Sequence, residues 1–208
     1  MADHPDMDVA KRSHFLDIVL KECERLTRLI NQVLDLAKLE SGVADWHPAE
    51  IDMVALLQEV LESTQQITKA KAISLESEIN TDLPIIWADL DRVEKVIVNL
   101  LSNAIKFCDD HCGQVRVRAS RQNGSVRIDV NDNGAGLTKE EQQVIFEKFR
   151  QVGKTQKKRT LGTGLGLPIS ARIVSHFGGK LWVESEPGQG ATFSFTLPVS
   201  KKDGEMGR

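Results

Sequence analysis

Three short runs rich in asparagine and glycine, in a fixed order and widely spaced, constrain the fold of this chain more than any other feature. They are NLLSNAIKF at 99–107, DNGAG at 132–136 and GTGLGL at 162–167. Each run alone is a weak signal. Together, an asparagine-bearing helix, a carboxylate in a glycine turn and a glycine-rich loop that opens a helix predict a nucleotide pocket.

Composition narrows the classes of protein to which the chain can belong. The 208 residues are 40% hydrophobic and 27% charged, which suits one or two globular domains with a real core. The formal net charge of −3 gives no reason to expect binding to nucleic acid or to an anionic membrane. No run of about 18 apolar residues is present, so we expect no membrane contact by this chain. We expect a cytoplasmic location, whether or not a longer parent is membrane-anchored.

The cysteines are few and odd in number, which is typical of a reducing interior rather than of a disulfide framework. Cys108, His111 and Cys112 lie close together and offer metal-ligating side chains. No second cluster completes a four-ligand site, so we interpret this segment as a helix end followed by a turn and expect no zinc.

Residues 9–42 have a helical period and contain neither glycine nor proline before Gly42. Apolar residues recur there at alternating steps of three and four, as in a bundle helix: Leu16, Val19, Cys23, Leu26, Ile30, Val33 and Ala37. Such a helix needs partners, and we favour an incomplete helix bundle over a helix that folds against its own domain. We expect residues 1–8 to be disordered and 199–208 to form a flexible tail.

We expect a linker at 43–51 and a mixed domain over 52–198. Helical patterns cover about 52–69, 90–107, 138–146 and 164–177, and β-rich runs cover 73–79 and 85–89. An Asn-Gly turn joins 115–120 to 125–132, and Pro-Gly-Gln-Gly joins a second pair of strands, so two hairpins follow. The pattern predicts an α+β fold, an α/β sandwich whose mixed sheet carries helices on one face, preceded by a long bundle helix.

The residues of the first two motifs suggest definite chemistry. Asn99 and Asn103 are four apart on one helix and project from the same face, where neutral amides suit a hydrated Mg²⁺ and phosphate oxygens. Lys106 adds a positive charge for phosphate. Asp132 suits an exocyclic amine such as that of adenine, and Gly134 and Gly136 permit a tight turn. The competing interpretations are surface asparagines that cap loops and a plain Asx turn.

The third motif leads directly into a helix. Backbone N–H groups at a helix start attract an anion, and the basic residues Lys154, Lys157, Lys158 and Arg159 come just before. We interpret the basic segment as a lid over phosphate rather than a solvated loop. The run is neither a P-loop nor a dinucleotide fingerprint, because it lacks the Gly-Lys-Ser/Thr ending and an immediately preceding strand.

This order of motifs resembles the ATP-binding catalytic domain of sensor histidine kinases in the GHKL superfamily. Residues 99–107 resemble the N box of that family and 132–136 its first glycine box. Phe146–Phe149 resembles the F box, residues 162–167 resemble the second glycine box, and residues 188–193 resemble the terminal glycine motif. The likeness spans about residues 50–198 and implies a Bergerat-type ATP fold.

The resemblance implies a role for each matching residue. Asn103 would ligate Mg²⁺ with the support of Asn99, Lys106 would contact phosphate, and Phe107 would pack on adenine. Asp132 would bind the adenine amine with Thr192 near it. The remaining nucleotide-binding residues would be those of the two glycine boxes and the lid: Gly134, Gly136, Lys158, Gly162, Thr163, Gly164, Leu165, Gly166 and Leu167.

Residues 14–42 resemble the second helix of the family's dimerisation and phosphotransfer domain. The first helix, which carries the phosphorylated histidine, is not among these 208 residues, and His14 lacks the acidic neighbour and the proline of that motif. The resemblance implies transfer of the γ-phosphoryl group of ATP to a histidine outside this chain, for relay to an aspartate of a response regulator. A parent kinase of this family would be a homodimer.

Three alternatives stay open from the sequence. A clamp-type ATPase related to gyrase, mismatch-repair or chaperone proteins tends to have glutamate where Asn99 stands. A serine kinase of the anti-sigma type does not need the helix at 9–42. A nucleotide-binding scaffold without chemistry would not require a full set of phosphate-site residues.

Overall fold

The computed structural model describes residues 9–109, 111–152 and 162–199, and it divides into two compact units, Met1–Val43 and Ala44–Arg208. The described residues of the first unit form one helix, α1, at Val9–Ser41, and the short segment that follows it. Its large apolar side chains include several that are mostly exposed: Leu16, Val19, Leu20, Leu26, Ile30, Val33 and Leu34. The helix at 9–42 is thus confirmed, and the helices that would cover it stay a prediction. Among the described residues, no helix is long and apolar enough to cross a membrane.

The second unit is built on a mixed five-stranded sheet in the order β2-β4-β5-β7-β6. The strands are β2 at Ser74–Ile79, β4 at Gln114–Gln122, β5 at Ser125–Asp132, β6 at Lys180–Ser185 and β7 at Ala191–Pro198. The β2–β4 pair is parallel and the other pairs are antiparallel. This arrangement confirms the predicted fold class.

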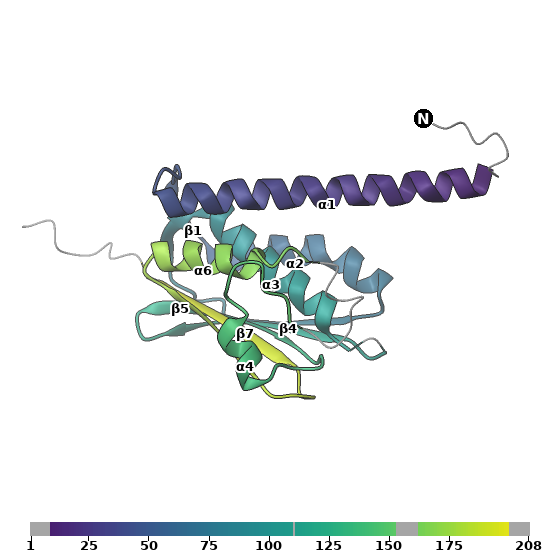
Figure 1. The fold of residues 1–208 in the computed structure, drawn as a ribbon. Helices are drawn as coiled ribbons and strands as arrows, with labels where there is room; N and C mark the ends of the chain where they lie inside the picture. Colours follow the sequence, from purple (N-terminus) through teal and green to yellow (C-terminus); the bar gives the residue numbers. More distant parts are fainter. Residues whose placement is uncertain (1–8, 110, 153–161, 200–208) are drawn as a thin grey trace, which may run out of the picture. The chain divides into compact units, whose positions relative to one another are not determined.

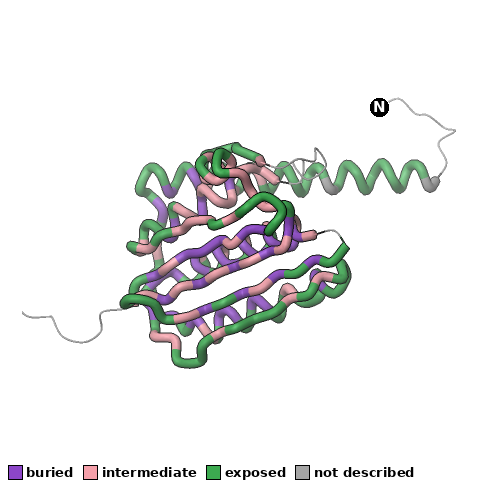
Figure 2. Tube along the Cα trace, turned by 90° about the horizontal axis from the view of Figure 1, so that it is seen from below, coloured by how far each residue is buried: buried purple, intermediate pink, exposed green. Residues whose placement is uncertain are grey.

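Helices α2 at Met53–Ala70, α3 at Leu90–Phe107 and α6 at Gly166–His176 lie over one face of the sheet (Figure 1). Along β5, buried and partly exposed residues alternate strictly, as a sheet covered on one face requires. Figure 2 shows the same alternation from the sheet side. The core lies between the two layers and includes fully buried side chains from both: Leu57, Ile97, Leu100, Ile128, Leu165, Ile173 and Phe195.

Side-chain caps set where the helices begin. Asp52 accepts hydrogen bonds from the backbone N–H groups of Val54 and Ala55 at the start of α2. Asp89 caps α3 by accepting from Arg92 N. The short helix α4, at Lys139–Val144, begins with a complete capping box between Thr138 and Glu141.

One element departs from the expectation. Residues 48–51 lie within the predicted linker, yet Pro48–Ile51 forms strand β1, which pairs antiparallel with β3 at Ile86–Asp89. Just before it, Trp46 stacks on His176 with ring centroids 3.7 Å apart, and Asp89 accepts a hydrogen bond from His47 N. Within the second unit, these contacts fix the segment that enters the sheet against α3 and α6.

Candidate nucleotide site

The three sequence motifs meet along helix α3, and three glycines make the close approaches. A Cβ on Gly134 would collide with the carbonyl oxygen of Phe107, and a Cβ on Gly166 would lie 2.9 Å from Asn99 Cγ. A Cβ on Gly162 would lie 3.1 Å from Lys106 Nζ. Gly134, Gly162 and Gly166 therefore stand where the second and third motifs approach the first, and the structure brings all three runs together as predicted.

Asn99 and Asn103 lie on the same side of α3, and both are partly exposed. Asn99 Nδ2 donates a hydrogen bond to Ser170 Oγ of α6 at 3.0 Å. Asn103 makes no side-chain hydrogen bond to any other residue that the structure describes. Its amide oxygen therefore remains available to a cation, as a magnesium ligand needs to be.

Lys106, in the last turn of α3, faces the start of the glycine-rich loop at Gly162. Its ammonium Nζ sits 4.4 Å from the centroid of the Phe107 ring, and within the described chain no carboxylate forms an ion pair with it. Partial burial lowers the pKa of Lys106, because the charged form loses hydration. A poorly hydrated, unpaired cation of this kind is suited to bind phosphate oxygens.

The start of α6 is open to an anion. Leu165, the residue before α6, makes no side-chain cap hydrogen bond, and its N–H donates to Thr163 Oγ1. Gly164 has φ +72°, and Phe149 donates from its backbone N–H to the Gly164 carbonyl. Among the described residues, the first N–H groups of α6 thus have no side-chain acceptor, which fits a phosphate site.

Asp132 is almost fully buried at the end of β5, and its carboxylate accepts a hydrogen bond from Gly134 N. A Cβ on Gly190 would collide with the Asp132 carbonyl oxygen, so the β6–β7 turn closes over the same strand end. The carboxylate lies on the helix-covered face of the sheet, because β5 alternates and Asp132 is one of its buried residues. This is the face on which α3 lies.

The expected position of Thr192 near the Asp132 side chain is wrong. Thr192 pairs with Asn131 across β5 and β7 and accepts a hydrogen bond from Asn131 Nδ2, whereas Ala191 is the residue opposite Asp132. Because successive side chains of a strand point to opposite faces, Thr192 and Asp132 lie on different faces of the sheet. Motif order does not resolve which of two adjacent residues faces the site.

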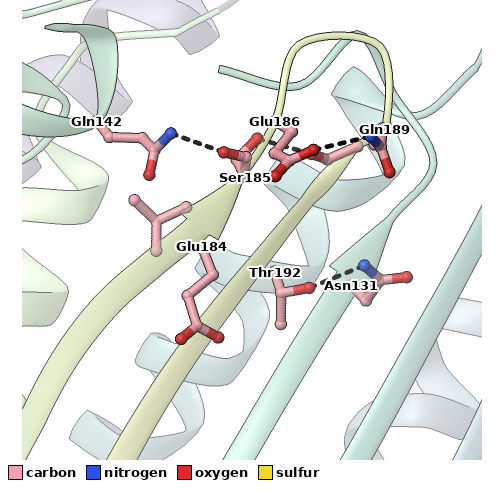
Figure 3. Close-up of a pocket in the computed structure, with 9 residues that line it drawn as sticks. Asn131, Gln142, Glu184, Ser185, Glu186, Gln189 and Thr192 are labelled. Atoms are coloured by element: carbon pink, nitrogen blue, oxygen red, sulfur yellow. Dashed lines mark hydrogen bonds between the residues drawn. The ribbon is translucent and has the colours of Figure 1, made fainter. Parts of the chain in front are cut away.

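Thr192 instead lines a polar hollow of about 490 Å³ on the other face of the sheet (Figure 3). Its lining comes from β5, β6, β7 and α4: Asn131, Gln142, Val183, Glu184, Ser185, Glu186, Gln189, Gly190 and Thr192. Its donors are used internally, since Gln142 donates to the Ser185 carbonyl and Gln189 to Glu186. The hollow contains none of the other predicted site residues and is separate from the candidate nucleotide site.

The remaining site predictions have mixed outcomes. Lys158 and the rest of the basic segment lie outside the described residues. Asp109 is engaged as a loop cap, because its carboxylate accepts from the N–H groups of His111 and Cys112, and this lowers its pKa to about 2. Among the described residues, no group of three or more His, Cys, Asp or Glu is placed to hold a metal ion.

Residues 88–201 match the family model described as histidine kinase-, DNA gyrase B-, and HSP90-like ATPase. The chain belongs to this ATPase family. The matched segment contains all three motifs and every residue discussed above as part of the candidate nucleotide site.

Individual relatives of this ATPase are sensory kinases. The adaptive-response sensory kinase SasA of Prochlorococcus marinus is 35% identical over 190 residues, which cover 88% of this chain and 50% of that protein. The alginate biosynthesis sensor protein KinB of Pseudomonas aeruginosa is 36% identical over 190 residues, which cover 91% of this chain and 31% of KinB. The chain thus spans half or less of the length of these relatives.

Solved structures agree with this assignment. The crystal structure of full-length ShkA in complex with AMPPNP aligns with a TM-score of 0.79 and 32% identity, over 94% of this chain and 40% of that one. Histidine kinase ThkA in complex with the response regulator TrrA aligns with a TM-score of 0.76 over 95% of this chain and 54% of that one. At 22% identity, the second likeness speaks for the fold alone.

Two residues of the candidate nucleotide site were not predicted from the sequence. Ser170 is buried on α6 and reaches Asn99, although a serine inside a helical run gives no signal of its own. Asn133, the second residue of DNGAG, accepts from the backbone N–H of Gln114 and donates to the Cys112 carbonyl. It braces the loop that follows α3, a role that the Asx-turn interpretation of the motif foreshadowed only in part.

Proposed function

We propose that this chain binds Mg²⁺-ATP along α3 and transfers its γ-phosphoryl group to a histidine on a helix outside these 208 residues. The phosphoryl group would pass from there to an aspartate of a response-regulator receiver domain. The observation that carries the proposal is the convergence of the Asn103 amide, the Lys106 ammonium and the start of α6, none of which is bound by a side chain of opposite hydrogen-bonding character or charge among the described residues. Family membership and the AMPPNP complex of ShkA support it.

The residues of the chain suit the parts of such a nucleotide. Asn103 would hold Mg²⁺ with one amide oxygen, and Lys106 together with the first N–H groups of α6 would hold the phosphates. Asp132 would accept a hydrogen bond from the adenine amine, with Phe107 packed near it. Bound Mg²⁺ would neutralise charge that builds on the phosphate oxygens.

Catalysis by such a site rests on positioning and charge rather than on a base. A neutral imidazole is already a nucleophile near neutral pH, so the site need not deprotonate it. Lys106 and the helix start would stabilise the charge on the transferred group. Asn99 is an amide, which neither accepts a proton from water nor activates it, and this favours phosphoryl transfer over hydrolysis.

Binding is tested first, by calorimetric titration with AMPPNP in Mg²⁺ and again in EDTA. Asn103→Ala should weaken the Mg²⁺-dependent affinity by about ten- to a hundredfold, the value of a bond to a charged group. Asn80→Ala, which removes an exposed asparagine after β2, is the matched control and should bind like wild type. Unchanged affinity and metal dependence in Asn103→Ala would contradict the assigned site.

Transfer is tested next with γ-labelled ATP and a separately supplied phosphotransfer helix pair from a matched kinase. We expect label on the supplied helices that is stable to alkali and labile to acid. Incubated alone, the chain should take up little label. Strong self-labelling of that chemical type would contradict the inference that the acceptor histidine lies outside this chain, and rapid release of phosphate would favour a hydrolytic ATPase.

A further inference from the structure

Ser170 is an unusual residue for its place in the fold. It is 2% exposed and is the one polar member of the buried face of α6, beside Ile169, Ile173 and Val174. A buried hydroxyl needs a partner, and the partner of Ser170 is the side-chain amide of Asn99 at 3.0 Å. The contact joins the helix of the first motif to the helix that the third motif opens.

Asn99 is held on two sides by α6. Its Nδ2 donates to Ser170 Oγ, and its Oδ1 lies against Gly166, four residues earlier on the same helix. Residues four apart share a face of a helix, so Gly166 and Ser170 together contact the Asn99 amide from the same face of α6. Asn103, one turn further along α3, makes no side-chain hydrogen bond to another described residue.

We propose that Ser170 is a positioning residue that fixes the Asn99 amide and, through it, the spacing between α3 and the first turn of α6. The inference rests on the proposed function. The spacing matters there because Asn103 and Lys106 on α3 must contact the same metal–phosphate group as the N–H groups of α6. Without the hydroxyl, the Asn99 amide loses its fixed orientation. The Mg²⁺-dependent part of nucleotide affinity then weakens.

The test compares Ser170→Val with Ser170→Thr. These two side chains have nearly the same shape, and both are branched at Cβ, so they differ mainly by a methyl in place of the hydroxyl. Affinity for AMPPNP is measured in Mg²⁺ and in EDTA, together with the melting temperature without ligand. Ser170→Thr should keep the wild-type ratio of the two affinities within about twofold, whereas Ser170→Val should lose about three- to tenfold in Mg²⁺ and little in EDTA.

Each outcome supports or overturns the positioning role of Ser170. Equal ratios in the Val and Thr variants, or an equal loss with and without Mg²⁺, would overturn the proposal and leave Ser170 a packing residue. A wild-type chain that binds no nucleotide, or binds it without regard to Mg²⁺, would refute the proposed function, and this inference would fall with it.

A second measurement needs no ligand and does not require that the Ser170→Val variant folds. The side-chain NH₂ resonances of Asn99 are followed by ¹⁵N NMR in wild type, Ser170→Ala and Ser170→Thr. We expect them to shift and to gain exchange with water in the Ala variant, and to stay near the wild-type positions in the Thr variant. Resonances that are unchanged in Ser170→Ala would overturn the positioning role.

Discussion

Replacement of Gly166 by alanine provides a demanding test of the nucleotide site, because the backbone conformation at this position is compatible with alanine. Gly166 is the first residue of α6 and is not among the residues with positive φ, and alanine favours a helix by up to about 1 kcal/mol. The obstacle is a side chain of α3. A Cβ would lie 2.9 Å from Asn99 Cγ and 3.1 Å from its Nδ2, and closer still to Oδ1.

Ordinary contact begins at 3.4 Å, so the Asn99 amide or the start of α6 must move by at least 0.5 Å. The move breaks the bond to Ser170, worth about 0.5–1.5 kcal/mol, and overpacking costs about 1–3 kcal/mol. Because binding must restore the wild-type arrangement of Asn99 and α6 that the variant has left, the net cost of that arrangement, about 1–3 kcal/mol after the helix preference is subtracted, should appear as roughly five- to 150-fold in affinity. Calorimetric titration with AMPPNP and Mg²⁺ measures it directly.

Ser175→Ala is the matched control on the same helix. Ser175 is an exposed residue near the end of α6 and has no place in the proposed site. Its affinity should change by less than about threefold. The reasoning is refuted if both variants lose affinity equally, or if Gly166→Ala binds like wild type. A double-mutant cycle adds a sharper check, since Gly166→Ala should cost little once Asn99 is already alanine.

Other expected outcomes follow from single contacts. Lys106→Met should weaken Mg²⁺-AMPPNP binding by about ten- to a hundredfold in a titration without lowering the melting temperature, because burial already opposes the charge and lowers the pKa of Lys106. Asp89→Ala removes both the α3 cap and the acceptor for His47 N, and should lower the free energy of unfolding in urea by about 1–3 kcal/mol. The Asp109 carboxylate raises the pKa of the exposed Cys112 thiol, so Asp109→Asn should speed its alkylation by iodoacetamide at pH 8, and an unchanged rate would contradict this. Since the pKa of Asp109 is lowered to about 2 in the folded state, its stabilising effect on the loop should be complete above about pH 4 and lost as the pH falls toward 2, as amide exchange at Cys112 would report.

The elements that local sequence specifies were predicted closely. The bounds of α3 at 90–107 agree with the prediction, because Asp89 supplies a cap and the apolar period is uninterrupted. The hairpin of β4 and β5 follows from an Asn-Gly turn between alternating runs. In both cases the residues that determine the element lie within it or next to it, and tertiary packing does not change the local preference.

The misses share a dependence on distant partners. Strand β1 has only four residues, and its partner β3 lies more than thirty residues further along the chain. The face on which Thr192 lies is decided by its register against Asn131, which the spacing of motifs does not contain. The role of Ser170 exists only where α6 packs on α3. Pattern and resemblance place a residue in the right motif, but they do not choose its neighbour across a sheet or between helices.

The two asparagines of the first motif show where such reasoning meets its physical limit. Their spacing of four predicts one shared face of α3, and from this alone both amides suit the same cation. In the structure the two amides do different work: Asn99 is bonded to α6, while Asn103 is not engaged by any described residue. A buried serine one turn beyond Gly166 makes that division, because it gives one amide a partner and leaves the other without. The proposed metal–phosphate site would therefore depend on the contact between two helices, and a substitution on α6 that touches no ligand should still change how α3 binds one.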